Sequence, residues 1–266
     1  MLINNFSKQG FIVIKDAVDH KFLIKLQNTI INDTKMVKKR TKKINNSLFL
    51  KIIKNVKNQN LFDFIHPINK KIFSAELINE LLKQKKIISC LVNLLGRDLA
   101  VSGNSSLTIN LPKKENNYYF KDWHQEIWSG SSPSHVQLWS PIFQSSSNTG
   151  QIEFIKDSHT WGHVPHQNRR PISLPKNFKT IKTNISDRDL LVFSTLLLHR
   201  TAETQFPRMG MAMTVKNYKY RDMSFSDNQD WKIFSHSEIT KIQRVLGNHY
   251  LSPFRLIGQE KKFKNI

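Results

Sequence analysis

The sequence predicts a mainly β fold of the jelly-roll type, a sandwich or barrel of short strands with helices packed outside. Three observations support this prediction. Short β-like runs separated by clusters of Ser, Asn, Gly and Pro follow one another from about residue 99 to residue 220. Helical periodicity is concentrated before and after this region. Hydrophobic residues make up 39% of the chain and aromatic residues 10%, which is ample for a packed core.

The first part of the chain is expected to hold a strand followed by a helix. Residues 10–14 (GFIVI) have the composition of a short strand. Asp19 is then placed to be the N-cap of a helix that continues to Ile31. Residues 35–73 are rich in Lys and Asn with scattered apolar residues, so we expect a helical or irregular insertion there.

The clearest helical pattern comes directly before the strands. Ser74 could cap this helix, in which apolar residues recur at helical spacing until Gly96 ends it. The strands that follow are expected in these runs: 99–110, 117–127, 134–143, 150–155, 180–185, 189–194 and 209–218.

The last part of the chain is polar after Tyr220 and then predicts one more helix. Residues 235–238 (SHSE) resemble a capping box that would open it, and Gly247 would end it. The apolar residues expected to face inward from this helix are Ile239, Ile242, Val245 and Leu246.

The chain of 266 residues is expected to form one domain, since sandwiches and barrels often reach this length undivided and no repeat or long linker interrupts it. Within that domain, residues 1–98 would form an N-terminal strand and helices. Residues 99–220 would form the jelly-roll core, and residues 221–266 a C-terminal helical extension.

The formal net charge of +21 suggests nucleic acid, an anionic membrane surface or acidic ligands as partners. The lysines are scattered, however, often beside Asn and Ile, and these three residues share AT-rich codons. Base composition therefore explains the charge equally well. The densest basic run, residues 35–43 (KMVKKRTKK), is expected to be a solvated face or loop. Without a recognisable nucleic-acid-binding motif, we do not expect a nucleic-acid partner; the sequence predicts no oligomeric state.

The single cysteine, Cys90, excludes an internal disulfide and suits a reducing compartment. It lies in an apolar helical pattern, so we expect a buried small hydrophobe rather than a nucleophile. No apolar run reaches the ~20 residues of a membrane span. The N-terminus does not show the basic segment, long apolar core and cleavage site of a secretion signal, so the sequence does not support secretion. A cytoplasmic protein is the resulting expectation.

The segment 122–128 (DWHQEIW) places His124 and Glu126 one residue apart in an aromatic setting. In a β-strand, side chains two positions apart point to the same side, so an imidazole and a carboxylate would converge. Two ligands of one metal are often presented in this way. The alternative is a surface histidine beside a surface glutamate.

A metal at His124 and Glu126 needs at least one more protein ligand, which should lie at a strand end elsewhere in the barrel. His199 fits this position, because it follows the apolar run 190–198 (LLVFSTLLL) and precedes polar residues. Two imidazoles and one carboxylate, with three adjacent positions open, suit non-haem Fe(II) and oxygen chemistry. The alternative for His199 alone is a hydrogen-bonded histidine at a strand end.

Arg208 begins an alternating run, residues 208–215 (RMGMAMTV). Strand alternation places Arg208, Gly210, Ala212 and Thr214 on one face and Met209, Met211, Met213 and Val215 on the other. A guanidinium on the small-residue face would need an anion, and its planar fork fits a carboxylate. The hydroxyl of Thr201, on the same face as His199, could donate to that anion. The alternative is an ion pair between Arg208 and a protein carboxylate.

Another expected strand carries His135, Gln137 and Trp139 in alternation, and these residues could line the same pocket. Trp139 is a candidate for contact with a bound cofactor there. The alternative for Trp139 is a position in the core.

Together these segments resemble the phytanoyl-CoA dioxygenase family of Fe(II)/2-oxoglutarate-dependent oxygenases. The matching segments are 123–126 (WHQE) for the family's W-H-Q-D, 150–162 (GQIEFIKDSHTWG) for G-x-L-x-x-x-P-G-S-H-x-x-G, 187–194 (DRDLLVFS) for G-D-x-x-x-F, and 199–201 (HRT) for H-R-S. Arg208 follows at the expected distance. The order and spacing of these motifs extend from about residue 10 to residue 218.

The resemblance implies a double-stranded β-helix of the cupin-like type in which His124, Glu126 and His199 hold Fe(II). It implies 2-oxoglutarate as co-substrate, with its far carboxylate bound by Arg208 and Thr201. With O2, such an enzyme releases succinate and CO2 and hydroxylates an unactivated C–H bond of a small organic metabolite. The iron and co-substrate carry this chemistry, and the protein orients them.

Two departures from the family pattern stand out. Glu126 replaces the expected aspartate and is one methylene longer. Residues 156–159 (KDSH) replace P-G-S-H. Related halogenases lack the carboxylate, so Glu126 favours hydroxylation. The basic surface would suit an anionic or carrier-linked small-molecule substrate. The alternative function is a non-catalytic jelly-roll ligand-binding protein that retains a degenerate metal site.

Overall fold

Two antiparallel sheets form the centre of the computed structural model, which describes residues 2–33, 61–110, 122–143, 151–202, 208–220, 230–247 and 264–265. The order in the larger sheet is β1 (Phe11–Ile14), β9 (Leu190–Ser194), β4 (Val136–Phe143), β11 (Arg208–Asn217), β2 (Leu99–Val101), β12 (Lys232–Ser235) and β13 (Lys264–Asn265), with β3 (Ser106–Asn110) also paired to β11. The smaller sheet contains β10 (His199–Thr201), β5 (Ile152–Ile155) and β8 (Thr180–Lys182). A separate hairpin joins β6 (His166–Gln167) to β7 (Arg170–Pro171). This arrangement confirms the predicted mainly β jelly-roll class.

The larger sheet is covered on both faces, so its central strands are buried at nearly every position. In β4, all eight residues are buried. Leu138 and its β9 partner Val192 belong to the core beneath the helices. The next pair, Trp139 and Leu191, belongs to the core shared with the smaller sheet. Because successive side chains on a strand point to opposite faces, one sheet contributes to two cores.

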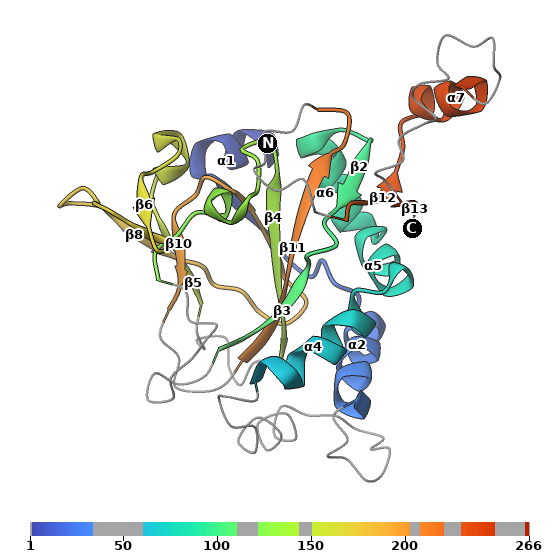
Figure 1. The fold of residues 1–266 in the computed structure, drawn as a ribbon, viewed down its shortest axis with the longest axis horizontal. Helices are drawn as coiled ribbons and strands as arrows, with labels where there is room; N and C mark the ends of the chain where they lie inside the picture. Colours follow the sequence, from blue (N-terminus) through green and yellow to red (C-terminus); the bar gives the residue numbers. More distant parts are fainter. Residues whose placement is uncertain are drawn as a thin grey trace.

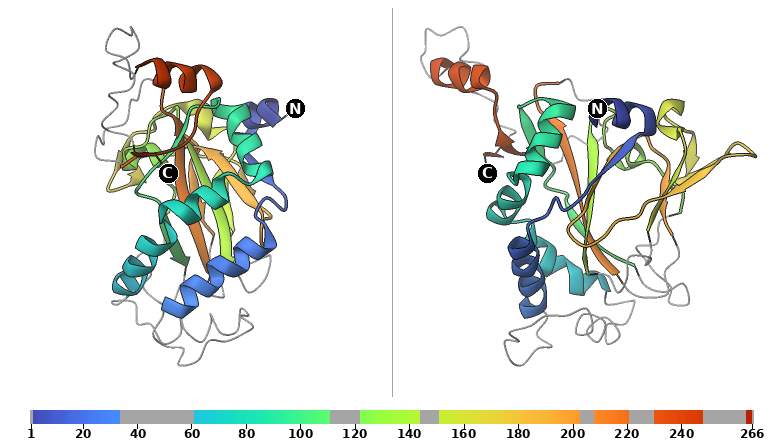
Figure 2. Two further views of the ribbon diagram at one scale, coloured as in Figure 1. Left: turned by 90° about the vertical axis from the view of Figure 1, so that its right-hand side faces the viewer. Right: turned by 180° about the vertical axis from the view of Figure 1, so that it is seen from behind.

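The helices before the strand region cover the face of the larger sheet that is opposite the smaller sheet (Figures 1 and 2). These helices are α2 (His20–Asp33), α4 (Leu61–Ile72), α5 (Ala75–Leu82) and α6 (Lys85–Leu95), while α1 (Leu2–Gln9) precedes β1. Leu26 of α2, Ile68 of α4 and Leu91 of α6 pack into the same core as Leu138. The other face of the sheet is therefore left to the smaller sheet and to the cavity between them.

The predicted strand at 10–14 and the helix that follows are confirmed. The carboxylate of Asp19 accepts hydrogen bonds from the backbone N–H groups of Lys21 and Phe22, at 2.9 and 3.1 Å, as an N-cap does. Within the insertion expected at 35–73, α4 is helical from residue 61. The rest of that insertion, including the basic run, lies outside the described residues.

The prediction of one helix from Ser74 to Gly96 is wrong, because two helices occupy this segment. The α5 helix ends at Leu82 and α6 begins at Lys85. Between them, Gln84 is extended (φ −59°, ψ 134°), and its side-chain oxygen accepts the N–H of Asp19 at 2.7 Å. The apolar spacing predicts the faces of the helices but not a change of axis imposed by a tertiary contact.

The expected strands are present with two main corrections. The run 99–110 is two strands, separated by a turn at 102–105. Of the run 117–127, residues 117–121 fall outside the described part, and the remainder is not a strand. It has an isolated bridge at His124 and then a 3₁₀ helix, η2 (Glu126–Ser129).

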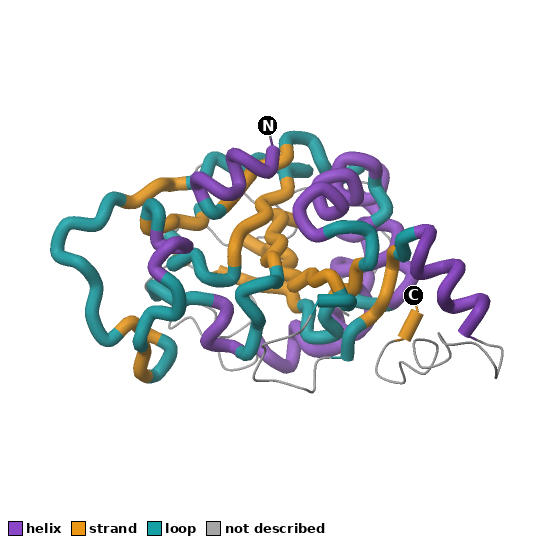
Figure 3. Tube along the Cα trace, turned by 90° about the horizontal axis from the view of Figure 1, so that it is seen from above, coloured by secondary structure: helices purple, strands orange, loops and turns teal. Residues whose placement is uncertain are grey.

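The C-terminal helix is present as α7 (Glu238–Gly247), but its expected inward face is wrong. The four apolar residues of that face are exposed, from 47% at Leu246 to 72% at Val245. The helix projects away from the two sheets (Figures 1 and 3). Across the described part of the chain, no helix has both the length and the apolar character needed to span a membrane.

The expectation for Cys90 is confirmed, since its side chain is buried in α6 and packs in the core beneath the larger sheet. Burial raises the pKa of this thiol to about 12. The thiol therefore remains protonated at neutral pH.

Candidate active site

The two histidines predicted to share a metal are neighbours across an antiparallel bridge. The N–H of His124 donates to the carbonyl of His199 at 3.0 Å, and the N–H of His199 donates back to the carbonyl of His124 at 3.0 Å. Directly opposed residues of such a pair place their side chains on the same side. The two imidazole ring centroids are consequently 4.1 Å apart.

Backbone carbonyls orient both imidazoles. His124 Nδ1 lies 2.6 Å from the carbonyl oxygen of Asp122, and His199 Nδ1 lies 2.9 Å from that of Leu197. A carbonyl only accepts, so Nδ1 carries the proton in each ring and Nε2 keeps its lone pair. These contacts select the tautomer in which Nε2 can bind a metal.

Glu126 completes the cluster. Its Oε1 is 3.2 Å from His199 Nε2 and 3.6 Å from His124 Nε2. Each residue offers one ligand atom, and the three atoms lie within 4.8 Å of one another. Three electron-pair donors so close together repel one another unless a proton or a metal ion lies between them; when Nε2 of His199 is protonated, its contact with Glu126 is a hydrogen bond. The donor set and its geometry therefore fit a divalent metal with two imidazole ligands and one carboxylate ligand.

Gln125 holds this segment in place. The residue is extended (φ −109°, ψ 144°), so His124 and Glu126 point to the same side although Glu126 begins a 3₁₀ helix. Its buried side chain points the other way, donating to the carbonyls of Gly162 and Leu196 and accepting the N–H of Val164. No role was expected for Gln125 from the sequence, where only its position between the two candidate ligands singles it out.

Arg200 lies between His199 and Thr201 and points away from the cluster. Its Nε donates to Glu153 at 2.7 Å, and its guanidinium lies 4.5 Å from the ring centroid of Trp123. Burial alone would raise the pKa of Glu153, but hydrogen bonds from Arg200 and Lys182 lower it below the ordinary value. This cluster fixes the strand that presents His199.

Arg208 is almost completely buried at 2% exposure. Its Nε donates to Asn110 Oδ1 at 3.0 Å, and the guanidinium lies 4.6 Å from the ring centroid of Trp139. No described residue forms an ion pair with it, so the alternative of a protein carboxylate partner finds no support in that part of the chain. Burial lowers the pKa of Arg208 to about 9, which still leaves the group charged at neutral pH. A buried cation in this state favours an anionic ligand.

The predicted alternation along β11 is confirmed. Met209, Met211 and Met213 pack into the core under the helices. The opposite face lines the cavity with Arg208, Ala212 and Thr214. Gly210 lies on this face too, and a Cβ there would come within 2.6 Å of the Trp139 ring. Glycine at this position therefore lets the indole approach the strand closely.

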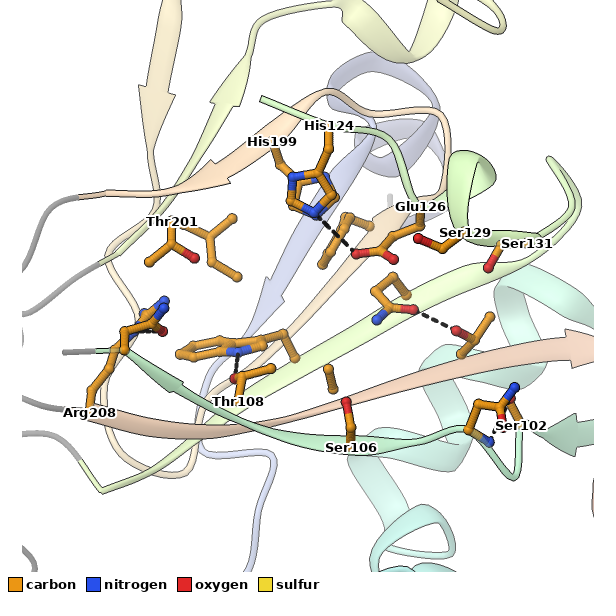
Figure 4. Close-up of a pocket in the computed structure, with 18 residues that line it drawn as sticks. Ser102, Ser106, Thr108, His124, Glu126, Ser129, Ser131, His199, Thr201 and Arg208 are labelled. Carbon is orange, nitrogen blue, oxygen red and sulfur yellow. Dashed lines mark hydrogen bonds and ion pairs between the residues drawn. The ribbon is translucent and has the colours of Figure 1, made fainter. Parts of the chain in front are cut away.

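A cavity of about 230 Å³ joins these groups (Figure 4). Its described lining residues are Ser102, Asn104, Ser106, Thr108, Asn110, His124, Glu126, Ser129, Ser131, Gln137, Trp139, Ile152, Phe193, His199, Thr201, Arg208, Ala212 and Thr214. All six predicted site residues are among them. Trp139 both lines the cavity and packs in the core between the sheets. The third residue of the alternating strand segment, His135, does not line the cavity; the backbone N–H of Ser132 donates to its Nδ1 at 3.1 Å.

Comparison with known proteins connects this site to a family. Residues 6–210 match the family model for phytanoyl-CoA dioxygenase (PhyH). No curated protein matches the chain significantly in sequence.

Several solved structures share the fold. The non-haem monooxygenase ThoJ, in its apo form, has a TM-score of 0.61 and 15% identity, covering 90% of this chain and 85% of its own. The epimerase SnoN, in complex with Fe3+, α-ketoglutarate and nogalamycin RO, has a TM-score of 0.56 and 11% identity, covering 81% and 82%. The α-ketoglutarate-dependent carbocyclase SnoK has a TM-score of 0.53 and 11% identity, covering 80% and 82%. With the family match over residues 6–210, the chain belongs to the phytanoyl-CoA dioxygenase family of non-haem iron, 2-oxoglutarate-dependent enzymes.

Proposed function

We propose that the protein hydroxylates an unactivated C–H bond of a small organic metabolite, using Fe(II), O2 and 2-oxoglutarate and releasing succinate and CO2. The observation that carries the proposal is the convergence of His124, Glu126 and His199 in the same cavity as the buried guanidinium of Arg208. A metal centre and an anion site in one cavity are what a metal-chelating dicarboxylate requires.

His124, Glu126 and His199 would hold the iron through Nε2, a carboxylate oxygen and Nε2. Two imidazoles and one carboxylate on one side of an ion leave adjacent positions open for other ligands. When bound, iron and 2-oxoglutarate together supply the activation of O2. The protein contributes by fixing the two imidazole tautomers through the carbonyls of Asp122 and Leu197.

Arg208 would bind the far carboxylate of 2-oxoglutarate through its planar fork. Thr201 lines the cavity and would donate its hydroxyl to the same group. Trp139 lies against the guanidinium and, with Asn110, holds it in one orientation. Because Arg208 is shielded from water, the ion pair with the co-substrate would be stronger than on the surface.

Glu126 in place of the family's aspartate is compatible with this role. Glu126 is the first residue of the 3₁₀ helix η2 and follows the extended Gln125. In this position its carboxylate already approaches Nε2 of both His124 and His199. The additional methylene is thus accommodated by the local backbone. The presence of a carboxylate at this position supports hydroxylation over halogenation.

The test is succinate release by protein reconstituted anaerobically with Fe(II), then mixed with O2 and 2-oxoglutarate, with mass analysis of added metabolites. We expect turnover in the wild type and in the control His20→Ala, which removes an exposed imidazole outside the site. His199→Ala and Glu126→Ala should abolish it. Oxygen insertion into the metabolite would separate hydroxylation from epimerisation and ring closure.

Turnover that survives both substitutions would contradict the assigned ligands. Binding of iron and 2-oxoglutarate without succinate release, with every candidate metabolite tried, would contradict the enzyme proposal and favour a ligand-binding protein.

A further inference from the structure

The end of the cavity away from Arg208 has its own chemistry. Figure 4 shows Thr201 and Arg208 at one end, the three candidate iron ligands between, and serine side chains toward the other end. Ser129 and Ser131 lie beside Glu126, and Ser102 lies farthest from Arg208. If 2-oxoglutarate extends between Arg208 and the metal, this serine-rich end remains for the substrate.

We propose that this substrate end binds a neutral, hydroxyl-rich group, such as one ring of a neutral sugar or polyol. The inference rests on the function proposed above and specifies the class of substrate. It differs from the sequence-based expectation of an anionic or carrier-linked substrate, which relied on net charge alone.

The described residues of the lining offer no ionic partner for the substrate. Among the described lining residues, the only groups that carry or can gain charge are Arg208, Glu126 and the two histidines, all of which have assigned partners. The remaining polar residues are Ser102, Asn104, Ser106, Thr108, Asn110, Ser129, Ser131, Gln137, Thr201 and Thr214. A charged substrate group would lose its hydration here without gaining a counter-charge, which is strongly unfavourable.

The serine hydroxyls of the lining favour a substrate that forms hydrogen bonds. The hydroxyls of Ser106, Ser129 and Ser131 have no hydrogen-bond partner among the described residues, although all three residues line the cavity. Ser131 is only 4% exposed, so its hydroxyl meets the cavity rather than bulk solvent. Each hydroxyl can donate one hydrogen bond and accept others. An apolar substrate would leave the buried hydroxyl of Ser131 unsatisfied, at roughly 1–3 kcal/mol, and would cost less at the half-buried Ser106 and the exposed Ser129.

Gln137 adds donors on the wall formed by β4 and β11. The hydroxyl of Thr214 donates to Gln137 Oε1 at 2.7 Å, which fixes the amide. The amide nitrogen of Gln137 retains two N–H groups for a ligand acceptor. This end therefore offers both donors and acceptors, which match the hydroxyl groups of a polyol.

The size of the cavity limits how much of the substrate enters. Its volume of about 230 Å³ is below the roughly 300–1,000 Å³ of sites that enclose drug-sized ligands. Part of this volume would be taken by 2-oxoglutarate. The part of the substrate inside the cavity is therefore limited to a group of about the size of one six-membered ring.

The proposal is tested by comparing how tightly the protein binds three related sugars, one neutral, one anionic and one cationic. Isothermal titration calorimetry would use protein loaded with Zn(II) and 2-oxoglutarate, which cannot turn over. The probes are methyl β-D-glucopyranoside (neutral), D-glucuronate (anionic) and D-glucosamine (cationic), with cyclohexanol as an apolar ring. We expect the neutral glycoside to bind at least tenfold tighter than the other three. Ser131→Ala and Ser106→Ala should each weaken it by about 3- to 10-fold, the effect of one hydrogen bond.

Two controls separate this inference from the proposed function. Ser134→Ala removes a hydroxyl from the same loop as Ser131 but outside the cavity lining, and should leave glycoside binding unchanged. Binding of 2-oxoglutarate is measured first, on every variant. If it is absent in the wild type, the proposed function fails.

If 2-oxoglutarate binds, three results would overturn the substrate proposal. Glucuronate, glucosamine or cyclohexanol could bind tighter than the glycoside. Ser131→Ala and Ser106→Ala could leave glycoside binding unchanged. The neutral glycoside could fail to bind at all.

Discussion

Arg208 is a buried cation, and its surroundings become favourable only when an anion reaches it. We predict that Arg208→Met abolishes the stabilisation of the protein by 2-oxoglutarate while leaving the unliganded protein folded. The apolar side chain avoids the desolvation of the guanidinium but leaves Asn110 without its hydrogen bond. The free energy of unfolding without ligand should therefore change by no more than about 1 kcal/mol. In the wild type, 2-oxoglutarate at 100 times its Kd should add about 2.7 kcal/mol.

Denaturant unfolding of the Zn(II)-loaded protein with and without 2-oxoglutarate measures both quantities. Arg200→Met is the matched control, because Arg200 pairs with the buried Glu153 on the opposite side of β10. That variant should lose stability without ligand but keep its stabilisation by 2-oxoglutarate. Equal stabilisation of Arg208→Met and the wild type would remove Arg208 from the co-substrate site.

Gly210 is required by the close approach of the Trp139 ring. We predict that Gly210→Ala destabilises the protein by about 1–3 kcal/mol and weakens 2-oxoglutarate binding, because the new Cβ would displace the indole on which Arg208 rests. Trp139→Phe removes the part of the ring that the Cβ meets. In the double variant the two effects on unfolding free energy should therefore be less than additive. Strict additivity in this double-mutant cycle would show that the Cβ and the indole do not interact.

At the scale of elements, the sequence predicts which strand faces line the cavity better than it predicts the helices. Strand alternation correctly assigns both faces of β11, because the period of two does not depend on what covers the sheet. The convergence of His124 and Glu126 is also correct, although the helical start at Glu126 was not expected. Its extended neighbour Gln125 is enough to keep both side chains on one side.

The two wrong predictions about the helices have the same physical cause. An amphipathic pattern shows which face is apolar, but not whether the axis bends or whether any partner covers the face. The break between α5 and α6 follows from the contact of Gln84 with Asp19, sixty-five positions away. The exposure of Ile239 and Val245 on α7 follows from where the helix stands, away from the sheets. Both are tertiary features that local spacing does not contain.

The N-cap of α7 tests directly whether the local sequence pattern or the tertiary contact determines where the helix begins. The sequence favours Ser235, but in the structure the hydroxyl of Ser237 accepts the N–H of Thr240 at 3.2 Å and donates to Asp98 at 3.0 Å. We predict that Ser237→Ala speeds backbone hydrogen exchange within α7, by an amount that corresponds to about 1 kcal/mol. The slow exchange of the core strands should not change, because α7 projects from the sheets. Ser235→Ala should leave exchange in α7 unchanged, and the reverse pattern would assign the cap to Ser235.

For the whole molecule, composition and strand spacing predict the mainly β jelly roll but not the lining of its cavity. Ser106 on β3, Ser131 after η2 and Thr214 on β11 meet only because β3 and β4 both pair with β11. These are pairings between segments distant in sequence, and local patterns carry no information about them. The hydroxyl-rich end of the cavity could therefore be recognised only in three dimensions.

The net charge of +21 is a further property of the whole molecule, and the co-substrate offers a way to test its role. A field of this sign should attract the dianion 2-oxoglutarate and speed its encounter with the cavity. We predict that the association rate falls by about tenfold or more as ionic strength rises from roughly 0.01 to 0.5 M, as the Debye length shrinks from about 30 Å to a few ångströms. The dissociation rate should change much less, because the contact with Arg208 is buried and poorly screened.

Stopped-flow mixing of the anaerobic Fe(II) protein with 2-oxoglutarate would measure both rates, and the neutral glycoside provides the control for non-electrostatic effects of salt. If salt slows only the dianion, the positive surface assists co-substrate capture while the uncharged end of the cavity selects the substrate. If the association rate of 2-oxoglutarate does not respond to salt, the field does not reach the cavity mouth. The lysines would then reflect base composition rather than selection for an anionic ligand.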